Sequence, residues 1–175
     1  FLEMVKRPSF GWPTFDDAHT VQVNEKKECS LKYFLSIYGE VGKKFEWTDQ
    51  FLNGSDKVLA FLKSQKVKFF ELNVNSSVAG FFMLDFREKW VCDLAYFGLI
   101  EGYIGKGLGS YMLSYAILTA WERNIKIMSV NTNTLDHVVA LPLYKKFGFR
   151  VVRTESHTRI LHNERICDGR FSLAD

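Results

Sequence analysis

The amino-acid sequence predicts a mixed α/β fold, in which antiparallel strands and a parallel crossover share one central sheet. Three apolar stretches with short polar connections are typical of an antiparallel meander, and they lie at 67–74, 78–86 and 91–100. A strand, a helix and another strand are then expected at 125–131, 137–147 and 149–154. Because two strands joined by a helix normally run in the same direction, this second pattern predicts a parallel crossover.

The first third of the chain predicts one strand and two helices. Its start is irregular apart from a candidate strand at 20–24. A serine, which is a favoured N-cap residue, begins each of two helices expected over 30–38 and 55–64. Gly39 and Gly42 follow the first of these helices and are expected to end it.

The second half of the chain predicts two more helices. Apolar residues recur with helical spacing over 108–123, which indicates an amphipathic helix with one face packed on the sheet. The helix expected over 137–147 contains Pro142, and a proline beyond the first turn removes a hydrogen bond, so this helix must start late or bend. Gly148 is expected at the C′ position that closes it. A hairpin is expected to continue through 159–161.

Length and composition limit the classes of protein. The 175 residues predict a single domain over 1–175, and 47% hydrophobic with 25% charged residues excludes a disordered or fibrous chain. The net charge is only +3 and the basic residues form no stripe, so no nucleic-acid partner is expected. No apolar run approaches the ~20 residues that cross a bilayer, and no signal peptide is evident, so no membrane is expected.

The cysteines indicate the redox environment. Cys29, Cys92 and Cys167 are odd in number and lack the spacing of metal ligands. We therefore expect free thiols, no bound metal and a reducing, cytoplasmic location. Composition leaves a monomer or a homodimer open.

A glycine-rich turn is the most informative segment. Four glycines in 101–110 follow a strand and precede the helix expected from residue 108. Glycines let successive main-chain N–H groups converge, and a helix N-terminus favours negative charge, so the segment predicts an anion site to which Lys106 can add a contact. The alternative is a tight connection with glycine at positive φ.

Two common phosphate motifs do not fit this turn. The P-loop requires a glycine where Ile100 stands and a Ser or Thr where Gly107 follows Lys106. The dinucleotide fingerprint follows the first strand of a βαβ unit, whereas this turn follows three antiparallel strands.

The turn does match a Gln/Arg-x-x-Gly-x-Gly/Ala signature, with Gly107 and Gly109 as its glycines. A second segment, 134–149, ends in Tyr-x-Lys-x-Gly-Phe. By these two motifs in this order the sequence resembles the GCN5-related N-acetyltransferases, the GNAT superfamily, over about 67–152. The resemblance implies the GNAT acyl-CoA N-acyltransferase fold, with a mixed sheet of six or seven strands flanked by about four helices.

The resemblance implies acetyl-CoA as cosubstrate, with its pantetheine arm between two splayed parallel strands. It places the CoA diphosphate on the main-chain N–H groups of the turn, at Ile104, Gly105, Lys106, Gly107, Leu108, Gly109 and Ser110. Ile104 departs from the usual Gln or Arg, and His137 stands where the family often has Asn. Main-chain contacts do not depend on the side chain at 104. Asn131 and Asn133 can bind pantetheine amides, or serve as turn residues.

Three groups are candidates for the chemistry. The resemblance implies a main-chain N–H at a strand bulge, at Leu99 or its neighbour, as donor to the oxyanion. It also implies Tyr144 as the acid that protonates the CoA thiolate, against the alternative of a core tyrosine. Asp93 is a candidate base, because strict alternation places it with Phe97 and Leu99 on one face of its strand; the alternative is a structural carboxylate.

The remaining candidates are weaker. Glu71, Glu101 and His137 are further candidates for the base, while Asp136 is expected to cap the following helix. Trp12, Phe45 and Trp47 either line the acceptor pocket or bury loops.

We therefore expect an acetyl-CoA-dependent N-acyltransferase that acts on a primary amine of a small molecule or protein by direct attack. A non-catalytic CoA-binding regulatory domain of the same fold and a protein that binds a small anion are the alternatives.

Overall fold

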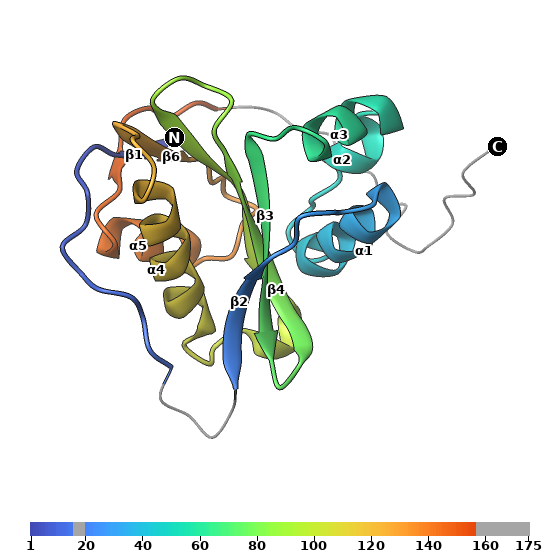
Figure 1. Cartoon of the computed structure of the whole chain (residues 1–175), viewed down its shortest axis with the longest axis horizontal. Coiled ribbons are helices and arrows are strands. Elements are labelled where there is room, and N and C mark those ends of the chain that lie inside the picture. The colour runs from blue at the N-terminus through green and yellow to red at the C-terminus, as the bar shows by residue number, and fades with distance from the viewer. Residues whose placement is uncertain (16–19, 157–175) are drawn as a thin grey trace.

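A seven-stranded sheet forms the centre of the computed structural model, which describes residues 1–15 and 20–156 (Figure 1). The strand order is β2-β3-β4-β5-β6-β1-β7. The strands are β1 (Leu2–Met4), β2 (Val21–Glu25), β3 (Val67–Val74), β4 (Ser77–Asp85), β5 (Val91–Leu99), β6 (Ile127–Val130) and β7 (Arg150–Val151). Since β2 to β5 are antiparallel and β5 pairs with β6 in parallel, the predicted mixed sheet is confirmed. The expected hairpin at 159–161 and Cys167 lie outside the described residues.

Helices cover both faces of the sheet. One face carries α1 (Leu31–Gly42), α2 (Asp49–Leu52) and α3 (Ser55–Leu62), and the other carries α4 (Leu108–Trp121) and α5 (Ala140–Lys146) (Figure 1). Phe34 of α1 is fully buried and packs at 6.4 Å from Phe81 of β4. On the opposite face Leu113 of α4 is equally buried, so each helical layer has its own apolar core. No helix in these two described ranges has the length and apolarity needed to cross a bilayer.

Helix α1 continues through Gly39 and ends at Gly42. The expectation that these two glycines end the helix is therefore confirmed at Gly42 and wrong for Gly39. A Cβ atom at Gly42 would lie 2.2 Å from Cβ of Trp47, and one at Gly39 would lie 3.2 Å from the Phe51 ring. The absence of a side chain at Gly42 lets Trp47 pack directly on the end of the helix.

The sequence did not predict β1, α2 or the 3₁₀ turn Glu101–Tyr103, and it misplaced the cap of α3. Neither β1 nor α2 was expected, since each is only three or four residues long. Ser30 caps α1 as predicted and accepts a hydrogen bond from the Tyr33 N–H. The N-cap of α3 is Gly54, with φ +75°, and Ser55 is its first helical residue. Cys29 and Cys92 are free thiols, as expected.

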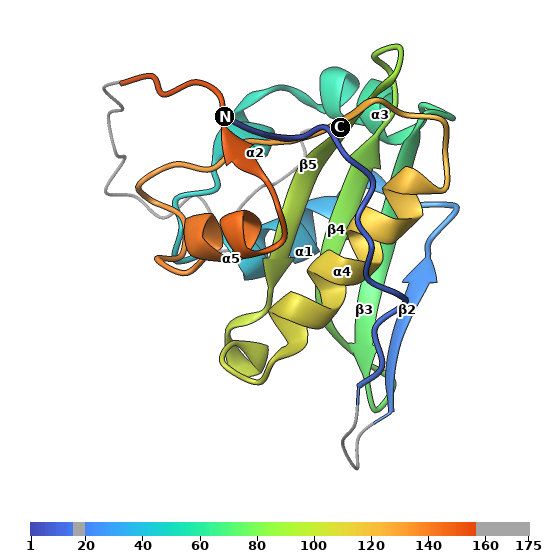
Figure 2. The ribbon, with the colours of Figure 1, turned by 90° about the vertical axis from the view of Figure 1, so that its left-hand side faces the viewer.

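The chain start covers the outer side of α4 (Figure 2). Trp12 packs on Tyr115 with ring centroids 4.8 Å apart, and Phe15 packs on Tyr111 at 5.6 Å. The expectation that only one face of this helix packs was therefore incomplete: apolar residues on its outer side meet the N-terminal segment.

The crossover from β6 through α5 to β7 is parallel, with β1 between the two strands and antiparallel to both. The late start at Ala140 places Pro142 in the first turn, where its missing N–H costs no helical hydrogen bond. Gly148 follows at φ +100°, as expected for a C′ glycine.

The parallel strands β5 and β6 separate after three pairs. Val91, Cys92 and Asp93 pair with Ile127, Met128 and Ser129, and no pair follows along β5 in the described chain. The remainder of β5, up to Leu99, therefore has β4 on one side and a gap on the other. The candidate site lies in this gap.

Candidate active site

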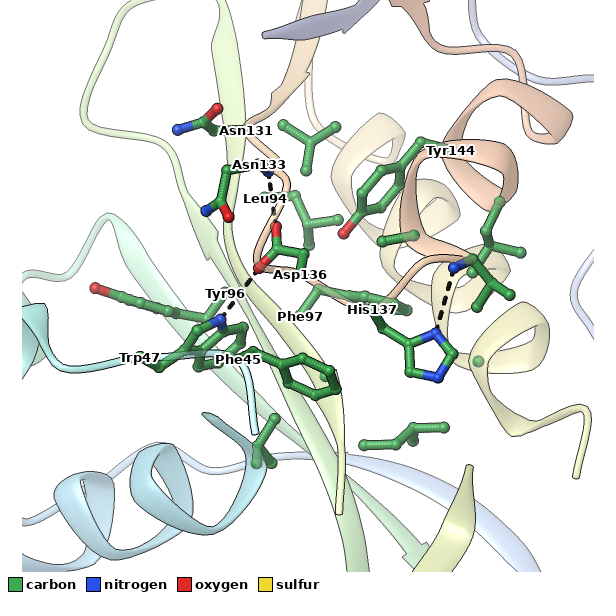
Figure 3. A pocket seen from close by; sticks show the side chains of 18 of the residues that line it. Phe45, Trp47, Leu94, Tyr96, Phe97, Asn131, Asn133, Asp136, His137 and Tyr144 are labelled. Atoms are coloured by element: carbon green, nitrogen blue, oxygen red, sulfur yellow. Dashed lines mark hydrogen bonds between the residues drawn. The ribbon is translucent and has the colours of Figure 1, made fainter. Parts of the chain in front are cut away.

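A cavity of about 250 Å³ opens between the loop after α1, the second half of β5 and the segment from β6 to α5. Its walls are mostly apolar, and six of the residues that line it are aromatic: Tyr38, Phe45, Trp47, Tyr96, Phe97 and Tyr144. Three carboxylates also line it: Glu46, Asp49 and Asp136. Figure 3 shows Trp47, Phe97, Asp136 and Tyr144 around the cavity, each from one of these three segments. The arrangement can enclose a small organic molecule beside a few polar groups.

A tight turn after α1 builds the aromatic wall. The N–H groups of Phe45 and Trp47 both donate to the Gly42 carbonyl, at 2.8 and 3.3 Å. Glu46 between them has φ +53°, a left-handed conformation that is uncommon for a residue with a side chain. Two rings separated by one residue can therefore line the same cavity. Of the three aromatic candidates, Phe45 and Trp47 lie here, while Trp12 packs on α4 instead.

Tyr144 presents a buried hydroxyl to this cavity. Its side chain is 5% exposed and packs against Phe97 and Phe149, with ring centroids 6.1 and 5.9 Å away. The hydroxyl points into the cavity (Figure 3), and no group of the described chain is hydrogen-bonded to it. Burial, with the nearby charge of Asp136, raises the pKa of this phenol above its ordinary value. The hydroxyl therefore keeps its proton at neutral pH and is available as a donor.

A bulge divides β5 into two halves. Met83 pairs with Tyr96 and Leu84 pairs with Leu94, which leaves Ala95 as an extra residue. The expectation of a bulge at Leu99 was therefore wrong, because the extra residue lies earlier in the strand.

The N–H groups beyond this bulge can be assigned a direction. The Ile100 N–H donates to the Ala79 carbonyl of β4, at 2.8 Å. Because main-chain groups alternate sides along a strand, the N–H groups of Phe97 and Leu99 point away from β4, into the gap beside β6. The role of Leu99 or its neighbour as an oxyanion donor stays a prediction.

The same bulge moves Asp93 to the other face. Leu94, before the bulge, shares an apolar cluster with Phe97 and Leu99 after it, while Tyr96 packs on the opposite face. Strict alternation, which grouped Asp93 with Phe97 and Leu99, was therefore wrong. Asp93 does not line the cavity of Tyr144 but a neighbouring one of about 600 Å³.

Asp93 lies where β5 and β6 separate. It accepts a hydrogen bond from the Ser129 hydroxyl at 2.7 Å. Burial raises the pKa of its carboxyl, and the Ser129 hydrogen bond opposes this rise. The two cavities share Val130 and Asn131 in their walls, so this carboxyl lies beside the site rather than in it.

The raised pKa of Asp93 predicts a pH-dependent effect of Asp93→Asn on stability. A group whose pKa is higher in the folded state stabilises it fully below the unfolded pKa, about 3.9, and loses that contribution as pH rises through the folded value. Asparagine does not titrate, so the free energy of unfolding of the variant relative to wild type should increase from pH 4 to pH 7. Urea unfolding at both pH values measures this, and a constant difference would contradict it.

The glycine turn leaves several N–H groups free at the start of α4. Gly105 and Gly107 have φ +82° and +78°, and Gly107 is the N-cap. The N–H groups of 105–109 donate to no acceptor in the described chain. Two of the four glycines adopt positive φ, as the interpretation of a tight connection expects. The anion site stays a prediction, which the unpaired N–H groups at the start of a helix favour. Ile104 and Gly109 line the cavity of Tyr144, so the turn and the cavity adjoin.

The loop before α5 is organised by Asp136. Its carboxylate accepts hydrogen bonds from the Thr132 hydroxyl, the Asn133 N–H and the Trp47 indole, at 2.8, 3.0 and 3.3 Å. The N-cap of α5 is Val139, so the expectation that Asp136 caps this helix was wrong. Helix α5 starts too late for residue 136 to reach it.

Three of the other polar candidates lie in the cavity. Asn131, Asn133 and His137 line it. The Asn133 side chain accepts from the Leu135 N–H, and His137 Nδ1 accepts from the Val139 N–H, so both also serve as turn residues.

Two other candidates for the base lie outside the cavity. Glu101 pairs with Lys44, and Glu71 pairs with Lys26 and Tyr33. Tyr38 and Tyr96 carry no signal in the sequence, because their places in the cavity depend on how α1 packs on β5.

Comparison with known proteins identifies the family. The family model described as "Acetyltransferase (GNAT) family" matches residues 34–149, which is more than half of the chain. The chain belongs to the GNAT acetyltransferase family. Its membership supports acetyl transfer as the general chemistry of the site. Comparison of the sequence with curated proteins finds no match.

Solved structures agree in fold with this GNAT chain. The IAA acetyltransferase of Bacillus cereus has a TM-score of 0.59 at 21% identity, covering 77% of this chain and 79% of that one. A transcriptional regulator of Bacillus halodurans has a TM-score of 0.62 at 14% identity, covering 81% and 100%. The aminoglycoside N-acetyltransferase AAC(6')-Iy, solved with CoA, has a TM-score of 0.57 at 11% identity, covering 87% of this chain and 99% of that one. At such identities these likenesses show a shared fold.

Proposed function

We propose that this protein transfers an acetyl group from acetyl-CoA to a primary amine by direct attack of the amine on the thioester. The observation that carries the proposal is that the glycine turn, with its unpaired N–H groups, and the hydroxyl of Tyr144 adjoin the same cavity, which Ile104, Gly109 and Tyr144 line together. An acyl donor with a diphosphate at one end and a thioester at the other needs these two features at two points of one site.

The donor would lie along the gap between β5 and β6. The free N–H groups of 105–109 would hold its diphosphate, with Lys106 adding a positive charge. The pantetheine arm would follow β5 beyond the last pair of the parallel ladder, where Asn133 and the N–H groups of Phe97 and Leu99 can meet its amides and its carbonyl. Binding in this way requires no side chain at position 104, which suits the isoleucine there.

The reaction forms a C–N bond and breaks the C–S bond of the thioester. The amine attacks the carbonyl, and the N–H of Leu99 or Phe97 would stabilise the oxyanion. Tyr144 would give its proton to the departing thiolate, and the amine would lose one proton to water or, through water, to Asp93. Holding both substrates in this geometry can supply up to about 7–11 kcal/mol, so positioning is the main contribution.

A screen of amines with acetyl-CoA tests the proposal. The protein should release free CoA thiol in the presence of an acceptor, as measured with a thiol reagent, and calorimetry should detect acetyl-CoA binding. Binding without thiol release for any primary amine would favour a CoA-binding regulatory domain. Absence of binding at millimolar acetyl-CoA would exclude both.

A further inference from the structure

The cavity of Tyr144 carries negative charge although the chain as a whole is positive. Glu46, Asp49 and Asp136 line it, and none of the lining residues of the described chain is Lys or Arg. The formal net charge of the protein is +3, so this local excess does not follow from composition. A concave site with carboxylates and apolar walls attracts cations.

The aromatic wall fits an organic cation better than a metal ion. Trp47 lies with its ring centroid 5.4 Å from that of Tyr38 and 6.1 Å from that of Tyr96. Aromatic faces attract ammonium groups and also accommodate the apolar body that carries them. Figure 3 shows Trp47 and Phe45 on one side of Asp136 and Tyr144 on the other.

Asp136 is oriented within this site and retains capacity for a ligand. Its Oδ2 accepts from the Thr132 hydroxyl and the Asn133 N–H, and its Oδ1 accepts from the Trp47 indole. A carboxylate accepts about four hydrogen bonds, so one acceptor position is left. The Tyr144 side chain is buried while its hydroxyl faces the cavity without a partner in the described chain, which is an independent sign of a missing ligand at the same place.

We propose that Asp136 binds the ammonium group of the acceptor, and that the acceptor is a small monoamine with a flat or apolar body. The inference rests on the acetyl transfer proposed above. A cavity of about 250 Å³ that must also admit the acetyl thioester favours a small acceptor. The acceptor binds as a cation and loses one proton to water before it attacks. It loses a second proton after the C–N bond forms, as described above, and Tyr144 regains from water the proton that it gave to the thiolate.

Binding of 2-phenylethylamine and of its neutral counterpart 2-phenylethanol tests this inference without acetyl-CoA. Calorimetry on the wild type should show at least about tenfold tighter binding of the amine, because a hydrogen bond to a charged group is stronger than one between neutral groups. In Asp136→Asn the preference should fall to near one, with the affinity for the alcohol within about twofold of wild type. Loss of both ligands together would indicate a structural role and overturn the proposal, as would a preserved preference for the amine.

Two further variants control the experiment. Asp56→Asn makes the same change of charge at an exposed position of α3 and should keep the preference for the amine. Trp47→Leu removes the aromatic face and should weaken binding of the amine more than fivefold. Unchanged affinity for the amine would overturn the role of the aromatic wall. Amine binding without thiol release would contradict acetyl transfer, whereas thiol release with an undiminished preference in Asp136→Asn would contradict the role of Asp136 alone.

Discussion

Replacing Tyr144 with phenylalanine should lower kcat for acetyl transfer by about 10²–10⁴-fold, the range for loss of general acid catalysis. The hydroxyl is buried, points into the cavity and has no partner in the described chain, so the substitution removes a proton donor and little packing. Because the pKa of Tyr144 is raised, kcat of the wild type should not fall through deprotonation of this residue up to the ordinary tyrosine value of about 10. Steady-state kinetics from pH 6 to pH 10 measure both effects.

Tyr115→Phe is the matched control for this substitution. Tyr115 lies on α4 and packs on Trp12, away from the cavity, so its variant should keep wild-type kcat. Acetyl-CoA affinity should remain within about twofold of wild type in both variants. If Tyr144→Phe keeps wild-type kcat with a good acceptor, Tyr144 is not the acid that protonates the CoA thiolate.

The strands and the glycine turn follow from local patterns. Apolar stretches at 67–74, 78–86 and 91–100 each match a strand to within a residue or two, because residues close in sequence decide whether the chain is extended. The glycine turn could be predicted in the same way. Gly105 and Gly107 adopt positive φ, which glycine does readily because it has no Cβ atom.

The faces of β5 could not be predicted. An extra residue at Ala95 reverses the alternation, so Asp93 faces away from the cluster of Phe97 and Leu99. Nothing in Leu94-Ala95-Tyr96 distinguishes a bulge from a regular strand, because no glycine or proline is present there. The register depends on how this strand pairs with β4.

The place of Asp136 in the cavity could not be predicted either. Asp136 and Trp47 are 89 positions apart, and their hydrogen bond forms only because the loop after α1 and the loop before α5 border the same gap. Local pattern favoured a helix cap for Asp136, which is the common role of an aspartate before a helix. Tertiary packing assigned it to the cavity instead.

Replacing Gly107 with alanine should weaken acetyl-CoA binding about 10- to 100-fold. Gly107 has φ +78°, a conformation that costs an L-residue about 1–2 kcal/mol. A Cβ there meets only the Phe15 ring, at 3.8 Å, so the effect is backbone strain and not a clash. If the turn relaxes toward negative φ, at least one N–H leaves the diphosphate, and a hydrogen bond to a charged group contributes about 1.5–3 kcal/mol. Calorimetric titration with acetyl-CoA measures the change.

Gly102→Ala separates strain at the turn from the addition of a methyl group nearby. Gly102 lies in the 3₁₀ turn Glu101–Tyr103, its φ is not positive, and a Cβ there meets no atom within 4 Å. This variant should bind acetyl-CoA as wild type does. Thermal unfolding without ligand should show a lower Tm for Gly107→Ala than for Gly102→Ala, because the strain is present in the free protein. Equal affinities in the two variants would mean that the main-chain donors of the turn do not hold the diphosphate, and the donor would then have to bind elsewhere.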